Sequence, residues 1–581
     1  MELPATADRG FQFRPPVLKN QYTDDLALQG ILSHYLPHEH FEHVQADLSN
    51  LGHRAITDIL AMGDNAEQHP PTLTQYDHWC RRIDKLETSE GWRALKGVSA
   101  IEGLVAIGYE RPLGEFSRIY QFAKLYVASP SMAMFPCPLA MTDGAARCVE
   151  LFGTQGMKQR ALSRLISRDP AVFWTSGQWM TERPGGSDVG GTETQAVRVG
   201  EDGRWHMSGF KWFSSATDSD MTLLLARTVN PASNTSIQGS KGLSLFYSEL
   251  RNADGNLDGI RVHRLKNKLG TKALPTAELE LYNLPGTMVG KENRGVATIS
   301  VVLNVTRIYS AMGATSNLRR AFAIAKSYAE NRTVFGKLLS EQPLHSSTLA
   351  EVAMTLRGCT IFLFYAVKVL GESECAPDEE RRKRAAAMLR LTTPLLKMWV
   401  CHEAVPAISE ALEACGGQGY MEETGVARQL RDAQVNAIWE GTTNVQALDV
   451  LKIVQGAFGV YASTVAESVK EGGKSAKVVE QGLRRIEDVL KMVSKWDRLQ
   501  REARARQIGF AMARTLIGAL LVDHAVALET TNHVDAAASR VCANRWCCDV
   551  TSLVGRLDTA DHGVEDDEVL VYGKPVSSAK L

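Results

Sequence analysis

The hydrophobic periodicity of the chain changes twice, near Pro170 and near Gly295. Before Pro170, apolar residues recur at three- and four-residue spacing, which predicts helices. From 171 to about 289, runs of β-branched and aromatic residues alternate with turn residues, and this pattern is typical of a β-sandwich or barrel. From Gly295 to about residue 456 the helical spacing returns in long segments, which predicts a helical bundle.

These changes of period define the expected domains. The chain has 581 residues, enough for two to four packed domains. No repeat with a period of about 20 to 50 residues is found, which excludes a solenoid. We therefore expect an α+β multidomain protein with an N-terminal helical domain over 1–168, a middle antiparallel β-sandwich or barrel over 169–290, a four-helix bundle over 291–455 and a C-terminal helical extension over 456–581.

Composition narrows the functional classes. The formal net charge of -1 gives no general attraction to nucleic acid or to anionic membranes, so such binding would need a local patch. The ten cysteines show neither a C-x-x-C pair nor even spacing, which predicts reduced thiols in an intracellular compartment. No run of about eighteen apolar residues occurs, so no membrane-spanning helix is expected. No metal site is predicted.

A glycine turn opens the predicted β domain, in the segment Met180-Thr181-Glu182-Arg183-Pro184-Gly185-Gly186-Ser187-Asp188. Its hydroxyls and backbone N–H groups suit a polar, phosphate-bearing ligand. Taken alone, the segment is more often a capped turn without any ligand. Further along the same domain, Lys211-Trp212-Phe213-Ser214-Ser215 brings aromatic rings and hydroxyls together.

Two more glycine-bearing segments lie in the predicted bundle. Arg332-Thr333-Val334-Phe335-Gly336 presents a guanidinium, whose fork of donors matches a diphosphate. An arginine is also common at the C-terminus of a surface helix, where the helix dipole favours a positive charge, so Arg332 need not bind a ligand. Cys415-Gly416-Gly417-Gln418-Gly419-Tyr420 lets the backbone approach a ligand closely, but the same glycines are equally expected as a helix stop.

A carboxylate lies between an aromatic residue and a glycine in Trp439-Glu440-Gly441-Thr442-Thr443-Asn444. Taken alone, a glutamate before a glycine is far more often a helix-end residue than a catalyst. A catalytic interpretation of Glu440 becomes better supported because the three preceding segments occur in the same chain. Together, in this order and at these separations, the four segments resemble the acyl-CoA dehydrogenase superfamily of flavoproteins, and within it the AidB-type branch.

The resemblance covers about residues 20 to 455 and implies a bound FAD. Thr181 would lie near the flavin N5 and Phe213 would stack on the ring, whereas Trp212, one position early, is also compatible with the core. The residues that the resemblance implies for FAD are Met180, Thr181, Gly186, Ser187, Phe213, Ser215, Arg332, Phe335, Glu413, Gly416, Gly417, Thr442 and Asn444.

The same resemblance implies catalysis by Glu440, with Arg307 nearby. Removing a proton α to a thioester needs a positioned base and a stabilised enolate oxygen, because the carbon acid is far weaker than any side chain. Glu440 would take the α-proton of an acyl-CoA while the β-hydride passes to FAD, giving the 2,3-enoyl-CoA. One departure puts the substrate in question: Asn304 replaces the acidic residue of the family's D-x-x-R pattern, in which Arg307 is kept.

Partners follow from the resemblance as well. Arg332 and Phe335 would reach the flavin of a neighbouring subunit, in a homo-oligomer that is a dimer of dimers. The electron acceptor would be oxygen or an electron-transfer flavoprotein.

The AidB-type branch supplies an alternative function, a flavin- and DNA-binding protein that protects from alkylation damage and has weak or no acyl-CoA turnover. Basic residues in the extension could contact phosphates. They include Arg498, Arg501, Arg504 and Arg506. An amphipathic helix with arginines on its solvent face is the more common explanation of such a ladder.

The chain ends in Ser578-Ala579-Lys580-Leu581. The last three residues, Ala579-Lys580-Leu581, are a close variant of the terminal S-K-L that receptors read as a peroxisomal address. We therefore expect a peroxisomal protein if the source is eukaryotic, and a cytoplasmic one otherwise. A peroxisomal address favours oxygen as the electron acceptor and fits poorly with a role on genomic DNA.

Overall fold

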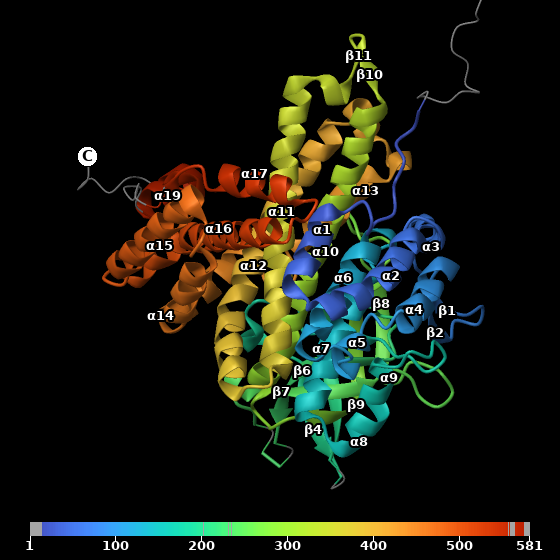
Figure 1. Cartoon of the computed structure of the whole chain (residues 1–581). Helices are drawn as coiled ribbons and strands as arrows, with labels where there is room; N and C mark the ends of the chain where they lie inside the picture. Colours follow the sequence, from blue (N-terminus) through green and yellow to red (C-terminus); the bar gives the residue numbers. More distant parts are fainter. Residues whose placement is uncertain are drawn as a thin grey trace, which may run out of the picture.

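The structure of the protein, a computed structural model, describes residues 14–573 apart from 201–202, 231, 234, 556 and 558–563. Figure 1 shows the N-terminal helices in blue, the β domain at the bottom, the long helices of the bundle in yellow-green to yellow, and the extension in orange to red at the left. The peroxisomal tripeptide lies outside the described residues and stays a prediction.

Helices dominate the N-terminal region, as predicted, and side-chain caps begin three of them, with Thr154 capping one of the shortest. The Asp25 carboxylate accepts from the Leu28 N–H at 2.9 Å, and the Ser89 hydroxyl accepts from the Trp92 N–H at 3.0 Å. The helices of this region are α1 (Leu26–Tyr35), α2 (His38–Arg54), α3 (Asp58–Gln68), α4 (Glu90–Ile101), α5 (Ile107–Glu110), α6 (Ser117–Ala128), α7 (Pro136–Phe152), α8 (Gln155–Met157) and α9 (Ser163–Leu165).

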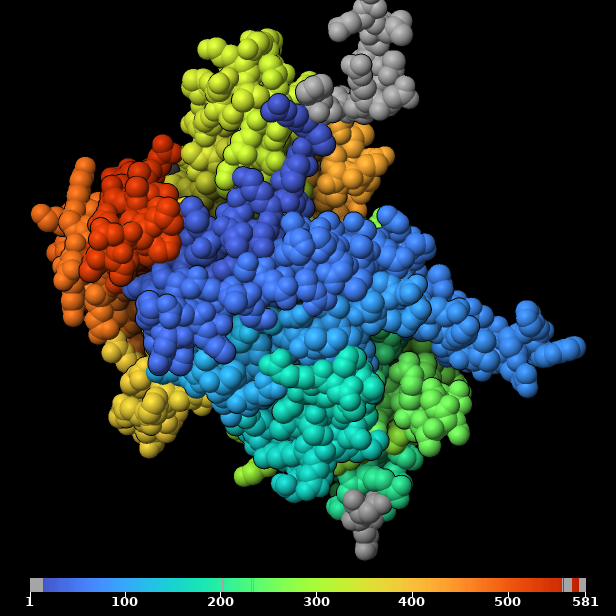
Figure 2. Space-filling view, turned by 45° about the vertical axis from the view of Figure 1, so that its right-hand side comes forward, coloured from blue at the N-terminus to red at the C-terminus, as the bar shows by residue number. Residues whose placement is uncertain are grey.

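A β-hairpin interrupts these helices, and the helical reading of the sequence did not include it. β1 (Thr72–Tyr76) pairs antiparallel with β2 (Arg82–Glu87), and Figure 2 shows this part of the chain projecting from the body. Asp77 closes the turn by accepting from the Arg81 N–H at 2.9 Å. The arginine that begins β2 donates to the Val262 carbonyl at 2.8 Å, so the hairpin also attaches to the β domain.

Seven strands form the middle sheet, and five of them close into a barrel. Pairing runs from β6 through β4, β5, β9 and β7 back to β6, with β3 beside β6 and β8 beside β9. Most pairings are antiparallel, as predicted, but β6 pairs in parallel with β3 and β4. The strands are β3 (Ser176–Trp179), β4 (Gln195–Val199), β5 (Arg204–Ser215), β6 (Met221–Val229), β7 (Leu243–Glu249), β8 (Ile260–Leu265) and β9 (Thr276–Val289).

Four long helices follow the barrel, as the helical period predicts. α14 runs past residue 455, where the predicted bundle ends, because Gly456 lies inside the helix instead of ending it. Bundle and extension therefore share one helix. The long helices are α10 (Gly295–Asn331), α11 (Pro343–Cys375), α12 (Glu379–Glu413) and α14 (Thr443–Ser468), and their connections hold β10 (Thr333–Val334), β11 (Lys337–Leu338) and α13 (Val426–Asn436).

The extension packs against the bundle. Its longest helix, α16, contacts α11, α12 and α14, and the ring of Trp546 meets Trp399 of α12 edge-on with 5.5 Å between ring centroids. These contacts cover the bundle on the side shown at the left of Figure 1. The helices of the extension are α15 (Gly473–Val493), α16 (Arg498–Thr530), α17 (Ala536–Trp546), α18 (Val550–Val554) and α19 (Val564–Tyr572).

Three helices, α10, α11 and α16, are long and apolar enough by composition to span a membrane, contrary to the expectation from the sequence. In the folded chain, 61%, 72% and 78% of their most apolar windows are buried inside the protein. Packing between helices therefore accounts for this composition.

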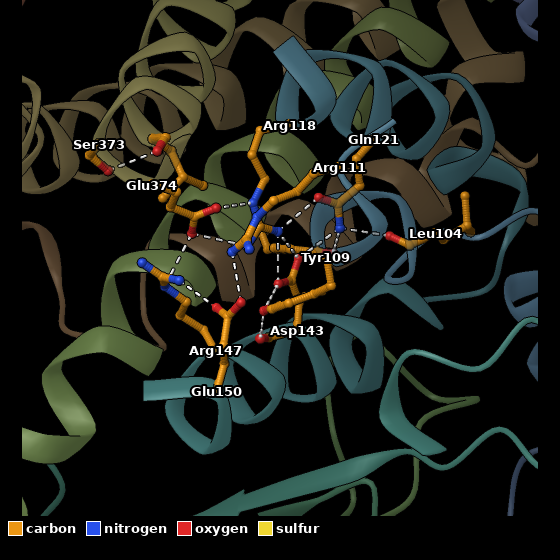
Figure 3. A network of polar contacts seen from close by, with 12 residues as sticks. Leu104, Tyr109, Arg111, Arg118, Gln121, Asp143, Arg147, Glu150, Ser373 and Glu374 are labelled. Atoms are coloured by element: carbon orange, nitrogen blue, oxygen red, sulfur yellow. Dashed lines mark hydrogen bonds and ion pairs between the residues drawn. The ribbon is translucent and has the colours of Figure 1, made fainter. Parts of the chain in front are cut away.

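A buried ionic network joins the N-terminal helices to the bundle (Figure 3). Arg118 on α6 donates to Asp143 on α7 at 2.9 Å and to both carboxylate oxygens of Glu374 on α11, at 2.8 and 3.0 Å. Tyr309 on α10 donates to the same Asp143 at 3.0 Å. Charges this deeply buried are stable only when paired, so the network fixes four helices relative to one another.

Candidate active site

Glu440 lies in a tight turn between α13 and α14, and both of its carboxylate oxygens accept hydrogen bonds. Thr306 on α10 donates to one oxygen at 2.8 Å, and Gln178 on β3 approaches the other at 3.4 Å. The backbone of Glu440 has a φ of 58° and Gly441 a φ of 95°. A left-handed conformation is strained for a glutamate, and such strain is characteristic of functional sites. We call residues 439–442 the Glu440 turn.

Side chains from three helices hold the backbone carbonyls of this turn. Gln446 on α14 donates to the Glu440 carbonyl at 2.7 Å, and the Arg307 Nε approaches the same oxygen at 3.4 Å. Lys397 on α12 donates to the Gly441 carbonyl. Arg307 therefore lies beside Glu440, as predicted, but it contacts the backbone and not the carboxylate. Its guanidinium also pairs with Asp449 at 3.2 Å.

Several polar groups around the Glu440 turn lack partners. Within the described part of the chain, the Glu440 backbone N–H makes no hydrogen bond, and neither do the buried Trp439 Nε1 and Gln178 Oε1 atoms. Buried polar groups without partners are rare in folded proteins. A ligand that reaches the turn would find free donors and a free acceptor there.

The predicted glycine turn lies at the end of β3 and is held by a buried ion pair. Glu182 accepts from the Lys211 ammonium at 2.6 Å. Burial alone would raise the pKa of Glu182, but the charge and hydrogen bond of Lys211 oppose burial, and the pKa is lowered overall. Gly186 packs closely on Thr181, because a Cβ at Gly186 would lie 2.6 Å from the Thr181 hydroxyl oxygen. Ser187 is exposed beside them.

A β-bulge in β5 re-aims the two aromatic residues of the Lys211–Ser215 segment. The register of β5 against β9 shifts between Lys211 and Ser214, so consecutive side chains no longer alternate strictly between faces. The Lys266 ammonium lies 3.4 Å from the ring centroid of Trp212 and 4.8 Å from that of Phe213. Trp212 is therefore not part of the barrel core, and Phe213 is 54% exposed.

Ser215 belongs to a chain of polar contacts that leads to Lys268, a partly buried lysine. Its hydroxyl is 3.0 Å from that of Thr276, which accepts from the Lys268 ammonium at 3.1 Å. Burial lowers the pKa of Lys268 to about 8. Among the residues that the structure describes, no group of His, Cys, Asp and Glu is arranged to hold a metal ion.

Four family models match successive parts of the chain: the adaptive response protein AidB N-terminal domain over 12–169, the acyl-CoA dehydrogenase middle domain over 177–284, the acyl-CoA dehydrogenase C-terminal domain over 293–455 and the acyl-CoA dehydrogenase 11 C-terminal domain-like model over 457–572. A Caenorhabditis elegans protein, acyl-CoA dehydrogenase family member 11, is 44% identical over 97% of this chain and 93% of its own length. The chain belongs to the acyl-CoA dehydrogenase family.

Relatives also place it near the AidB-type branch. The putative acyl-CoA dehydrogenase AidB of Escherichia coli is 31% identical over 76% of this chain and 80% of its own. The crystal structure of C. elegans ACDH-11 in complex with C11-CoA is 40% identical and superposes with a TM-score of 0.90 over 99% of both chains. Bd2924 in its apo-form is 44% identical, with a TM-score of 0.82 over 88% of this chain and 99% of that one. The predicted family and fold are confirmed.

A single chain of the protein brings together only part of the predicted FAD set. Met180, Thr181 and the residues of β5 lie on the barrel side of the site, connected to Glu440 through Gln178, which contacts both the Met180 sulfur and the Glu440 carboxylate. Thr442 is exposed at the start of α14. These side chains form the near group: Met180, Thr181, Gly186, Ser187, Phe213, Ser215 and Thr442.

The other predicted residues lie at the opposite end of α10, at the top of Figure 1. From Thr306 the helix rises about 38 Å along its axis before it ends at Arg332. Phe335 follows in the β10–β11 hairpin, where it is 99% exposed. One flavin ring therefore cannot contact both the Glu440 turn and Arg332 of the same chain. We call this set the far group: Arg332, Phe335, Glu413, Gly416 and Gly417.

Asn444 is placed in neither group, because its side chain contacts the C-terminal extension. The Arg506 guanidinium on α16 donates to the Asn444 side-chain oxygen at 3.4 Å and to the His402 ring at 2.9 Å. No sequence pattern indicates this contact, since the two residues come from segments predicted as separate domains.

Three residues of the site were missed in the sequence. Thr306 directly precedes Arg307, at a position that the D-x-x-R pattern leaves unspecified. Gln178 comes two residues before Met180, and nothing in its surroundings marks it. Lys397 carried a usable signal, because it is the only charged residue between Leu391 and Cys401, a stretch that the helical pattern predicts to be buried.

Proposed function

We propose that the protein is an FAD-dependent acyl-CoA dehydrogenase or oxidase that removes the α-proton and the β-hydride of an acyl-CoA thioester, giving the 2,3-enoyl-CoA. The Glu440 turn carries this proposal: it holds a carboxylate with two donors beside a backbone N–H that has no partner in the described part of the chain. The structure of the related ACDH-11 contains C11-CoA, which supports an acyl-CoA as the substrate class.

The geometry of the turn suits removal of a proton next to a thioester. Thr306 and Gln178 restrict the Glu440 carboxylate to one orientation, so an oxygen can be aimed at the α-carbon. As charge develops on the thioester oxygen, the Glu440 N–H can donate to it, and one such donor contributes roughly 3 kcal/mol. Bound FAD would supply the acceptor for the hydride.

The near group supplies the surface on which FAD would lie. Thr181 and Ser215 offer hydroxyls, and Phe213 offers an exposed ring for stacking on the isoalloxazine. Ser187 and the glycine turn offer donors for the pyrophosphate. The close packing of Gly186 on Thr181 explains why a side chain at 186 would disturb this surface.

A second copy of the chain would complete the cofactor site. The far group is too distant from Glu440 in the same chain, while the exposed Phe335 at a hairpin tip is placed to insert into another subunit. The predicted dimer of dimers therefore remains our proposal for the assembly. Sedimentation of the purified protein with and without FAD tests it, and a monomer that retains FAD would contradict it.

We keep the acyl-CoA substrate and the electron acceptor as proposals. Asn304 presents an amide where many relatives in the D-x-x-R pattern present a carboxylate, so contacts with the CoA portion should differ from theirs. We propose oxygen or an electron-transfer flavoprotein as the acceptor.

The DNA-binding alternative gains no support from the arginine ladder. Arg506 is engaged with His402 and Asn444, and Arg498 pairs with Glu502 at 2.7 Å within its own helix. The ladder is therefore not one continuous face open to phosphates. A salt-sensitive gel shift of duplex DNA by the purified protein would reinstate this alternative.

Anaerobic titration with a series of acyl-CoAs of different chain length tests the proposed reaction. We expect the visible flavin absorbance to bleach with at least one of them, and the enoyl-CoA to be found by mass spectrometry. Admission of air then separates the two acceptors, because an oxidase recovers its colour rapidly and releases peroxide. A flavin that no acyl-CoA bleaches would contradict the proposal.

A further inference from the structure

Lys397 is a buried ammonium that the proposed reaction does not use. Its side chain is 1% exposed and lies on α12, in a stretch where the apolar residues Leu396, Met398 and Val400 are buried as well. Within the described part of the chain it forms no ion pair with a carboxylate, and its hydrogen bond goes to the Gly441 carbonyl in the Glu440 turn.

This placement costs the fold more than an apolar residue would. A buried charge without a close counter-charge is unfavourable, and an uncharged side chain of similar length would fill the same space without the penalty. Burial lowers the pKa of Lys397, and the nearby Cys401 and Glu440 only partly oppose that effect. Such costs persist where a residue serves a site, since stability alone would not select them.

The hydrogen bond from Lys397 holds the strained part of the Glu440 turn. Glu440 and Gly441 both have positive φ, and the two carbonyls that follow their Cα atoms are the ones held by side chains. Arg307 and Gln446 hold the first carbonyl, while Lys397 holds the second, with Gln446 at a longer 3.4 Å. Releasing the second carbonyl would let the turn relax toward an unstrained conformation.

We propose that Lys397 is a positioning residue whose ammonium, by holding the Gly441 carbonyl, keeps the Glu440 turn in the conformation that aims the carboxylate and the backbone N–H of Glu440. The inference rests on the proposed function of Glu440 as the base. Lys397 touches neither substrate nor cofactor in this account, and it acts only through the backbone.

Lys397→Met tests the proposal in the FAD-loaded holoenzyme. Hydrogen exchange followed by mass spectrometry should show amides of the peptide spanning 437–446 exchanging at least about tenfold faster than in the wild type. The kcat for an accepted acyl-CoA should fall about 10- to 100-fold, because a small misplacement of a reacting group is costly, while KM changes little. Lys452→Met, at an exposed lysine on α14, is the matched control and should match the wild type in both assays.

Several results would overturn the inference. Unchanged exchange in 437–446 would show that Lys397 does not hold the turn, and faster exchange with an unchanged kcat would show that the turn's conformation does not matter for catalysis. Where Lys397→Met fails to fold, Lys397→Gln is measured by the same criteria, and loss of folding in both variants would assign Lys397 a purely structural role.

The failure of the proposed function can be recognised separately. A wild-type protein that no acyl-CoA reduces would refute the reaction, yet the exchange comparison would still decide whether Lys397 holds the turn.

Discussion

Replacing Arg118 with methionine removes the cation at the centre of the network in Figure 3 and keeps most of the side-chain volume. Asp143 and Glu374, whose side chains are 0% and 3% exposed, then lose the guanidinium that they share. Within the described part of the chain, Glu374 then keeps one ion pair, with Arg147 at 3.4 Å, and Asp143 keeps neutral donors such as Tyr309 at 3.0 Å. Uncompensated negative charge therefore remains in the core.

The expected loss follows from this burial. Removing one partner of a buried ion pair costs about 3–5 kcal/mol, because the other charge stays buried. For a domain of about 150 to 250 residues, each kcal/mol of lost stability lowers the melting temperature by roughly 2–4 °C. Differential scanning calorimetry of Arg118→Met should accordingly show a transition roughly 10 °C below that of the wild type.

Arg160 offers a matched control. It also forms a two-pronged ion pair, with Glu249, but its side chain is 56% exposed. Exposed pairs contribute about 0–1 kcal/mol, so Arg160→Met should shift the transition by no more than a few degrees. Adding Glu374→Leu to Arg118→Met should recover part of the loss. If Arg118→Met were no more destabilising than Arg160→Met, burial would not be the cause of the network's strength.

Three other outcomes are expected. Burial, with the neighbouring His34, lowers the pKa of His524 to about 3. Between about pH 6.5 and pH 3, the histidine therefore binds a proton in the unfolded state but not in the folded state. The free energy of unfolding then decreases as the pH falls from about 6.5 toward 3. His524→Phe should consequently recover about 2 kcal/mol in denaturant melts at pH 5 and almost none at pH 8, and equal effects at both pH values would refute this. Phe335→Ser should weaken FAD retention about tenfold on dialysis, whereas unchanged retention would exclude Phe335 from the cofactor site. Thr306→Val should lower kcat about tenfold, since the Glu440 carboxylate loses its shorter hydrogen bond, and wild-type kcat would exclude that role.

The arrangement of helices and strands could be predicted largely because periodicity is a local property. The change from a period of about 3.6 to a period of 2 marks the barrel, and its return marks the bundle. The parallel pairing of β6 with β3 and β4 could not be predicted, because strand partners depend on how distant segments meet. The hairpin β1–β2 was missed because its strands are short and lie among helical patterns.

In the candidate site, too, local patterns could be predicted and contacts between distant segments could not. Glu440 could be found because several segments along the chain form one recognisable pattern. Its contacts with Gln178 and Thr306 join residues 262 and 134 positions apart, and no local pattern announces them. The distance between the near group and the far group also depends on the length of α10, which becomes informative only when the helix is seen to be continuous.

The most direct test of the account is anaerobic reduction of the FAD-loaded Glu440→Gln variant by an acyl-CoA that bleaches the wild type. Glutamine keeps the size of the side chain but cannot take up the α-proton. We expect the variant to keep its yellow colour and bind the acyl-CoA, while bleaching slows at least about a hundredfold. Glu423→Gln, at an exposed glutamate before α13, should bleach like the wild type. Bleaching of Glu440→Gln at the wild-type rate would contradict the assignment of Glu440 as the base.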